Sequence, residues 1–260
     1  MRFAKQLTRV SLLLAVACAT MFGQQWVSLF DAKNPLKGWT NHDPDLGAYK
    51  VENGNEVVGR AFPSKDVKTE TGYVVYDISC TYEKEFTNFI LTWEEKLTPN
   101  TPGSLMFRSH IAGKHTEIPQ APMENRKTVQ GPAVMTLLPE GDVYGPQFVV
   151  RGSHEKTGWT TGNIFDDSRR KRYLDDEMEK RPGAMTAWKE GDIWNTLRLE
   201  VRGDHYQTFV NDIACADIHD PADKSGVIAL HIHGGVRAAT GINGGQPEAR
   251  YRNMKIQILP

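Results

Sequence analysis

Three observations predict that this chain folds as an all-β antiparallel sandwich. Short runs of β-branched and aromatic residues alternate with polar residues, as in strands that bury one face. Asn-Gly and Asn-Asp pairs stand between several of these runs and are typical of hairpin turns. No stretch repeats its apolar residues with the period of a long helix. In a chain of 260 residues, a 39% hydrophobic share is enough for a sizeable core.

The predicted strands follow one another from the first tryptophan to the C-terminus. They cover residues 57–58, 73–82, 89–96, 105–110, 147–150, 196–202, 206–210, 227–233 and 254–259. Turn signals lie at 53–54, 211–212 and 243–245. Many short strands joined by tight turns are the pattern of a sandwich.

Two segments interrupt this pattern and predict long loops. Residues 112–142 are rich in proline and glycine. Residues 152–187 are polar and contain the mixed-charge run 169–181, which we expect to form a loop or a short surface helix that ends before Pro182. Such a run is usually a solvated face, although long loops on a rigid sandwich often build the functional site.

The N-terminus has the layout of a secretory signal peptide. Three basic residues, Arg2, Lys5 and Arg9, precede an apolar run at 10–17, and small residues follow it. The run is too short to span a bilayer as a helix. The residues around Cys18 resemble a bacterial lipoprotein box. The sequence therefore predicts an exported bacterial protein that is periplasmic, extracellular or anchored through a lipid on Cys18.

Removal of a signal peptide at 1–23 leaves one predicted sandwich domain at 24–260. The formal charges of the whole chain nearly balance, with 31 basic and 32 acidic residues. We therefore expect no nucleic-acid partner. Cys80 and Cys215 could form a disulfide in an exported protein, or be buried as small apolar side chains. No CxxC spacing indicates a zinc site.

Two histidines near the C-terminus form the first candidate site. His231 and His233 are two residues apart in a predicted strand, so their side chains share one face. Imidazole transfers protons near neutral pH and is a common metal ligand. Two glycines follow and would let the backbone turn or a ligand approach closely.

Other predicted strands also have one apolar and one polar face. Phe89, Leu91 and Trp93 alternate with Glu94 and its neighbours, so the first three are expected in the core. In 105–110 the same alternation sends Arg108 and His110 to the polar side. Each of these residues could be an ordinary surface side chain. If the polar faces line one sheet, however, a group of side chains converges: Glu94, Arg108, Gln147, His231 and His233.

Several segments resemble, in order, the motifs of one known family. The opening Trp-Val-Ser-Leu-Phe and the Gly-Trp that follows it are similar to the family's first signature, and Phe-Ile-Leu-Thr-Trp-Glu to its Phe-x-Leu-x-x-Glu strand. The resembling segments are 26–39, 89–94, 103–108, 144–147, 191–195, 210–211, 226–233 and 251–256. Together they resemble the 3-keto-disaccharide hydrolase family, also called 3-keto-glucoside lyases or hydratases. The resemblance implies a concanavalin A-like sandwich, or jelly roll, with long loops.

Three positions differ from the family pattern. Gly145 stands where the family tends to have glutamate, and Val150 where it tends to have aspartate. His231 replaces a usual glutamine, whereas His233 matches the pattern.

The resemblance implies an enzyme that cleaves glycosidic bonds of 3-keto-sugars, with a glycan or oxidised sugar as substrate. The ketone acidifies the neighbouring C–H, so a base is needed, and His233 or Glu94 is the candidate. His231 would assist, or a divalent metal held by His231, His233 and a carboxylate such as Glu94 would stabilise the enolate. The candidates for holding the sugar are Arg108, His110, Gln147 and Lys189. The alternative is a carbohydrate-binding module without catalysis, because fold does not fix function.

Overall fold

The computed structural model describes residues 25–64, 72–99, 101–124, 127–151, 160–238 and 247–260. The predicted signal peptide at 1–23, with Cys18, and the turn predicted at 243–245 lie outside this part of the chain. Within it, no helix has the length and apolar character needed to cross a membrane.

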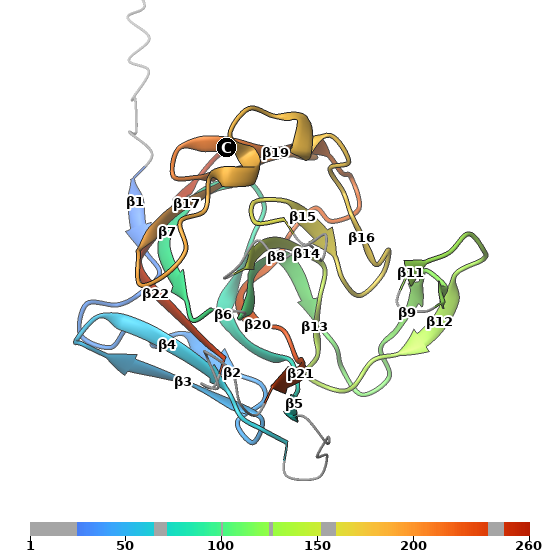
Figure 1. Cartoon of the computed structure of the whole chain (residues 1–260), viewed down its shortest axis with the longest axis horizontal. Helices are drawn as coiled ribbons and strands as arrows, with labels where there is room; N and C mark the ends of the chain where they lie inside the picture. The colour runs from blue at the N-terminus through green and yellow to red at the C-terminus, as the bar shows by residue number, and fades with distance from the viewer. Residues whose placement is uncertain (1–24, 65–71, 100, 125–126, 152–159, 239–246) are drawn as a thin grey trace, which may run out of the picture.

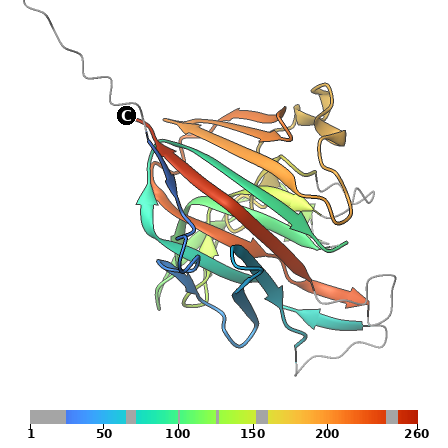
Figure 2. The same ribbon diagram turned by 90° about the vertical axis from the view of Figure 1, so that its left-hand side faces the viewer.

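Two antiparallel sheets face each other in the described part of the chain, which confirms the predicted β-sandwich (Figures 1 and 2). The first, here called the β7 sheet, has the order β19–β18–β17–β7–β22–β4–β3, with β1 on β22. Its strands are β19 (Ile213–His219), β18 (His205–Val210), β17 (Asn195–Arg202), β7 (Phe89–Leu97), β22 (Glu248–Ile258), β4 (Glu56–Ala61), β3 (Gly47–Glu52) and β1 (Trp26–Ser28). In Figure 2 the long red β22 crosses this sheet in front.

The second, here called the β8 sheet, has the order β16–β15–β14–β8–β20–β6–β2, with β13 on β8. Its strands are β16 (Arg172–Tyr173), β15 (Ile164–Asp166), β14 (Pro146–Arg151), β8 (Pro102–Ile111), β20 (Gly226–Ile232), β6 (Ile78–Phe86), β2 (Trp39–Asn41) and β13 (Val143–Tyr144). Many strands that are neighbours in a sheet are far apart in the sequence, such as β7 and β22. The core therefore depends on long-range contacts.

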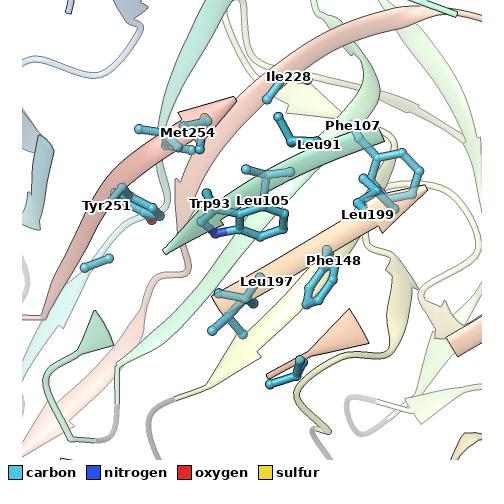
Figure 3. Packing of buried hydrophobic residues seen from close by; sticks show 14 of the residues in the cluster. Leu91, Trp93, Leu105, Phe107, Phe148, Leu197, Leu199, Ile228, Tyr251 and Met254 are labelled. Carbon is cyan, nitrogen blue, oxygen red and sulfur yellow. The ribbon is translucent and has the colours of Figure 1, made fainter. Parts of the chain in front are cut away.

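The core lies between the two sheets and follows the alternation that the sequence shows. In β7, Phe89, Leu91 and Trp93 are buried, and the residues between them are only partly covered. Trp93 meets Phe148 of the opposite sheet edge to face, with ring centroids 5.2 Å apart (Figure 3). This geometry is favourable for aromatic pairs and adds to the burial of both rings.

The loop predicted at 112–142 contains short hairpins instead of irregular chain. β9 (Glu117–Gln120) pairs with β12 (Val134–Leu137), and β10 (Met123–Glu124) pairs with β11 (Lys127–Thr128). These strands project to one side of the sandwich in Figure 1. The strand predicted at 73–82 is in fact two, β5 (Gly72–Val75) and β6, because β5 leaves the β8 sheet to pair with β21 (Gly235–Ala238).

The charged segment 169–181 contains a short helix that ends before Pro182, as expected, but its first arginines do not form the solvated face that we expected. It contains β16 and the short 3₁₀ helix η1 (Met178–Lys180), and a second one, η2 (Ala184–Thr186), follows Pro182. Met178 is fully buried. The arginines at the start of the run form ion pairs with buried aspartates, so the segment packs onto the sandwich.

The two cysteines of the domain are both free and buried. Cys80 lies in β6 of one sheet and Cys215 in β19 of the other. The disulfide alternative is therefore wrong, and the reading as small buried side chains is confirmed.

Arg108 points into the core, so its predicted place on the polar face of β8 is wrong. A register shift in β20 opposite this part of β8, together with a positive φ of 45° at Arg108, turns the side chain inward. Its guanidinium donates hydrogen bonds to the carbonyl oxygens of Thr87, Gly203 and Asp223 and to the hydroxyl of Tyr206. Arg108 thus closes one end of the core as a structural residue.

Replacing Arg108 by lysine is expected to lower the free energy of unfolding by about 2 kcal/mol or more, because an ammonium cannot reproduce the planar fork of donors. Denaturant unfolding measures the effect. Arg202→Lys is the matched control, since the Arg202 side chain is 52% exposed. Equal stability of the two variants would contradict the structural role of Arg108.

Candidate functional site

A polar cavity of about 170 Å³ lies on the outer face of the β8 sheet. Its floor comes from β6 and β20, and its walls from the segments after β2, around β9, before β13 and between β15 and β16. Residues lining it are Asp43, Asp77, Ser79, Gln120, Leu138, Asp142, Val143, Asp167, Ser168, Lys171 and His231. Loops that are far apart in sequence therefore meet over two neighbouring strands.

His231 is the buried centre of this cavity. Its Nδ1 lies 2.8 Å from the hydroxyl of Ser79, which fixes the orientation of the ring. Its Nε2 is buried without a hydrogen-bond partner in the described structure and lies 3.9 Å from Asp77 Oδ2. Burial, followed by the charge of neighbouring His233, lowers the pKa of His231 to about 4. The imidazole is therefore neutral at pH 7.

His233 stands beside His231, as the strand alternation predicts. The two ring centroids are 4.5 Å apart and the rings are nearly perpendicular. Burial acts to raise the pKa of the nearby Asp77, but His231, His233 and the amide of Gly234 outweigh it, and the pKa falls below its ordinary value. Asp77 is thus an anion close to two imidazoles.

These three residues have the donor set of a divalent metal site. Within the described residues, Asp77, His231 and His233 each offer one ligand atom, and these atoms all lie within 4.8 Å of one another. Two imidazoles and a carboxylate suit zinc, manganese, iron or cobalt. The buried, unpartnered Nε2 of His231 fits such an ion, because the ion would supply the missing partner. The carboxylate of the triad is Asp77, where the sequence suggested Glu94.

Three further carboxylates make the cavity acidic. Burial raises the pKa of Asp142 to about 6, and the charges of Asp43, Asp77 and Asp167 add to the shift. Burial also raises the pKa of Asp43, although a hydrogen bond from the Ser79 amide opposes it. An excess of negative charge around the neutral imidazole of His231 favours the binding of a cation. These aspartates lie outside the central strands, so strand alternation did not reveal them.

Gln147 shares the outer face of the β8 sheet with His231, as expected. It is fully buried, and its Oε1 accepts a hydrogen bond of 2.7 Å from Ser104, which pairs with His231 across the strands. Its Nε2 has no hydrogen-bond partner in the described structure. Gln147 therefore supports the floor of the site.

The predicted convergence is wrong for Glu94, and Lys189, a candidate for holding the sugar, does not line the cavity. Glu94 lies on the outer face of the β7 sheet, on the far side of the core, where it pairs with Arg252 and Asn253. Lys189 is an exposed loop residue whose backbone bonds to Asn195. Alternation along a strand gives the face of a side chain but not the sheet to which the strand belongs.

His110 lies outside the cavity lining, near the end of β8. Its Nε2 is 2.9 Å from Asp223, which also pairs with Arg169. His110 is thus tied to an ion-pair network at the edge of the sheet.

Two of the departures from the family pattern have structural explanations. Gly145 has a φ of 140°, and a Cβ there would lie 2.9 Å from the hydroxyl oxygen and 3.0 Å from the Cα of Ser109. A glutamate cannot be placed at this position without moving the backbone. Val150 is fully buried in the core, so its identity changes no group in the cavity.

The fold and the cavity define a concanavalin A-like β-sandwich with a ligand-type pocket built by loops on one sheet. Residues 25–257 match the family described as 3-keto-alpha-glucoside-1,2-lyase-like domains, and the chain belongs to this family. Family membership relates the protein to carbohydrate chemistry. No curated protein matches the chain.

Solved structures support the fold. A Bacillus subtilis protein of unknown function with a galectin-like fold is 11% identical, with 90% of this chain and 94% of that chain covered and a TM-score of 0.53. A structure described as a native glycosidic hydrolase is 10% identical, with 90% and 94% covered and a TM-score of 0.50. A carbohydrate binding module from Bacillus subtilis is 13% identical, with 85% and 95% covered, but its TM-score of 0.41 is too low to support the fold. At such identities the likeness shows the fold alone.

Proposed function

We propose that this protein is an exported enzyme that cleaves 3-keto-glycosides by elimination and hydration in the cavity around His231. The observation that carries this proposal is the triad Asp77, His231 and His233, of which Asp77 and His231 line an acidic cavity. The chain also belongs to the lyase-like family. Export rests on the signal-peptide pattern of residues 1–23.

The proposed reaction starts from a sugar that is oxidised at C3. The ketone acidifies the C2–H bond, so a base removes this proton and an enolate forms. The C1–O bond then breaks, the leaving oxygen takes up a proton, and a C1–C2 double bond remains. Water adds across that bond and gives the free 3-keto-sugar. The site must therefore stabilise an enolate and move protons at C2 and at the leaving oxygen.

The residues of the cavity match these needs. A divalent cation held by Asp77, His231 and His233 would supply a Lewis acid for the ketone oxygen. Ser79 holds Nδ1 of His231, and Nε2 of the same ring lies 3.9 Å from Asp77 Oδ2. Asp142 is the proposed proton-transfer group, because a carboxyl with a pKa of about 6 both gives and takes protons near neutral pH. Glu94 is not part of this mechanism, since it lies on the other sheet.

Methyl 3-keto-α-glucoside, incubated with the purified protein, tests the proposal. We expect release of methanol and 3-keto-glucose, loss of turnover after treatment with a chelator, and recovery when Mn²⁺ or Zn²⁺ is added. Chromatography follows the products. Turnover that a chelator does not affect would contradict the metal but not the cleavage. Saturable binding without product would instead indicate the carbohydrate-binding alternative.

A further inference from the structure

A second and larger hollow lies next to the polar cavity. This groove has a volume of about 570 Å³, against about 170 Å³ for the cavity. Successive residues of β9 line the two spaces in turn, because Pro119 lines the groove and Gln120 lines the cavity. The segment after β15 does the same, since Arg169 and Arg170 line the groove and Lys171 lines the cavity. The groove and the cavity thus share two walls, β9 and the segment after β15.

The chemistry of the groove differs from that of the cavity. Its surface comes mainly from prolines and small apolar side chains, including Pro119, Pro122, Val129, Ala133 and Ala222. No tryptophan, tyrosine or phenylalanine is among its lining residues, although sugar rings are commonly bound against such side chains.

The charges of the groove are already matched within the protein. Arg169 donates to both carboxylate oxygens of Asp223. Arg170 donates to both carboxylate oxygens of Asp220 and also to Asp166. The guanidinium groups of Arg169 and Arg170 are planar, and their charges are neutralised by these aspartates. They therefore favour stacking with a flat ring of a ligand over ion pairing with an anion.

We propose that this groove is the aglycone subsite and that it takes an uncharged, largely apolar aglycone such as an aromatic ring. The proposal rests on the proposed function of the cavity. Binding pockets for whole ligands usually measure about 300–1,000 Å³, so the cavity alone has room for little more than the sugar ring. The remainder of a glycoside must extend beyond it, and the groove is an adjoining space that combines a mainly apolar lining with planar guanidinium groups.

Ala222→Trp and Ala133→Trp, which fill the groove from two different loops, test this proposal. The substrates are phenyl and methyl 3-keto-glucoside, and each variant is compared with the wild type on each substrate, so differences in leaving-group reactivity cancel. We expect kcat/KM for the phenyl glycoside to fall at least tenfold, while that for the methyl glycoside changes less than twofold. The control is Ala214→Trp, at an exposed position in β19, which should alter neither.

The outcomes separate the two proposals. Equal losses on both substrates, or no loss on either, would overturn the aglycone subsite while leaving the cleavage reaction in place. If the wild type turns over neither substrate, the proposed reaction fails, and calorimetric Kd values of the two glycosides replace kcat/KM. Weaker binding of only the phenyl glycoside to both tryptophan variants would then still support the subsite, and unchanged binding would overturn it. Melting temperatures confirm that each variant is folded.

Discussion

Alanine in place of His231 is expected to lower kcat/KM for a 3-keto-glucoside by ~10³-fold or more, since proton-transfer and metal-ligand groups typically contribute at least ~10²–10⁴-fold. His231 is the buried member of the triad, and its neutral Nε2 faces Asp77 without a hydrogen bond. The variant should also lose tight binding of Mn²⁺ or Zn²⁺, which calorimetry measures without any substrate. Circular dichroism and melting temperature establish that the sandwich is intact.

Two further variants test whether the loss of activity is specific to the His231 site: Ser79→Ala, beside His231, and His205→Ala, a control on the other sheet. The hydroxyl of Ser79 orients the His231 ring, so its loss should reduce activity by ~10–100-fold, as for residues that support metal ligands. His205 is an imidazole paired with an aspartate on the other sheet, 2.7 Å from Asp217, and its removal should leave activity within about twofold. Normal turnover by His231→Ala would exclude the triad as the reaction centre.

The faces of the strands could be predicted from the sequence. Alternation in β7 placed Phe89, Leu91 and Trp93 in the core, and alternation over 227–233 placed His231 and His233 on one face. Side-chain direction in a strand is a local property with a period of two, so a few residues suffice to show it.

The sheet to which each strand belongs could not be predicted in this way. Glu94 and His231 are both on outer faces, but of different sheets, and only the long-range pairing of β7 with β17 and β22 decides this. The prediction that Arg108 lies on the polar face was wrong for a local reason. A backbone irregularity reverses the alternation of side chains within β8. Neither the pairing partner nor the irregularity leaves a clear pattern in a single sequence.

The acidic residues of the cavity were missed for a third reason. Asp43, Asp77, Asp142 and Asp167 come from four separate connections, and their approach depends on how the sandwich brings its loops together. In loops no periodicity marks a functional carboxylate, so aspartates that bind ligands resemble those that only face solvent. A resemblance to a family could indicate the chemistry, but the positions of these side chains required the fold.

Glutamine in place of Glu95 is expected to raise the stability of the protein above pH 5, by an amount that grows with pH. Glu95 is fully buried between the sheets, where alternation in β7 places it beside Trp93. The Trp93 indole donates a hydrogen bond of 2.8 Å to its Oε2, but its Oε1 has no hydrogen-bond partner in the described structure. Tyr251, its cross-strand partner, has a buried hydroxyl that also lacks one.

Burial raises the pKa of Glu95 from 4.5 to about 8. The folded protein therefore keeps a proton between about pH 4.5 and pH 8 that the unfolded chain releases, and stability falls as the pH rises through this window. At about 1.36 kcal/mol for each pH unit, the loss reaches at most ~5 kcal/mol at pH 8. Glutamine has nearly the same shape, can still accept the indole hydrogen bond and does not titrate.

Denaturant unfolding of wild type and Glu95→Gln at pH 5, 6.5 and 8 measures this effect. The wild-type free energy of unfolding should decline relative to that of the variant by several kcal/mol from pH 5 to pH 8. Tyr251→Phe serves as the control, because burial raises the pKa of Tyr251 well above its ordinary range and the hydroxyl keeps its proton throughout. This control should therefore retain the wild-type dependence on pH. Parallel pH profiles for wild type and Glu95→Gln would mean that the buried carboxyl is ionised at neutral pH and is stabilised by partners other than Trp93.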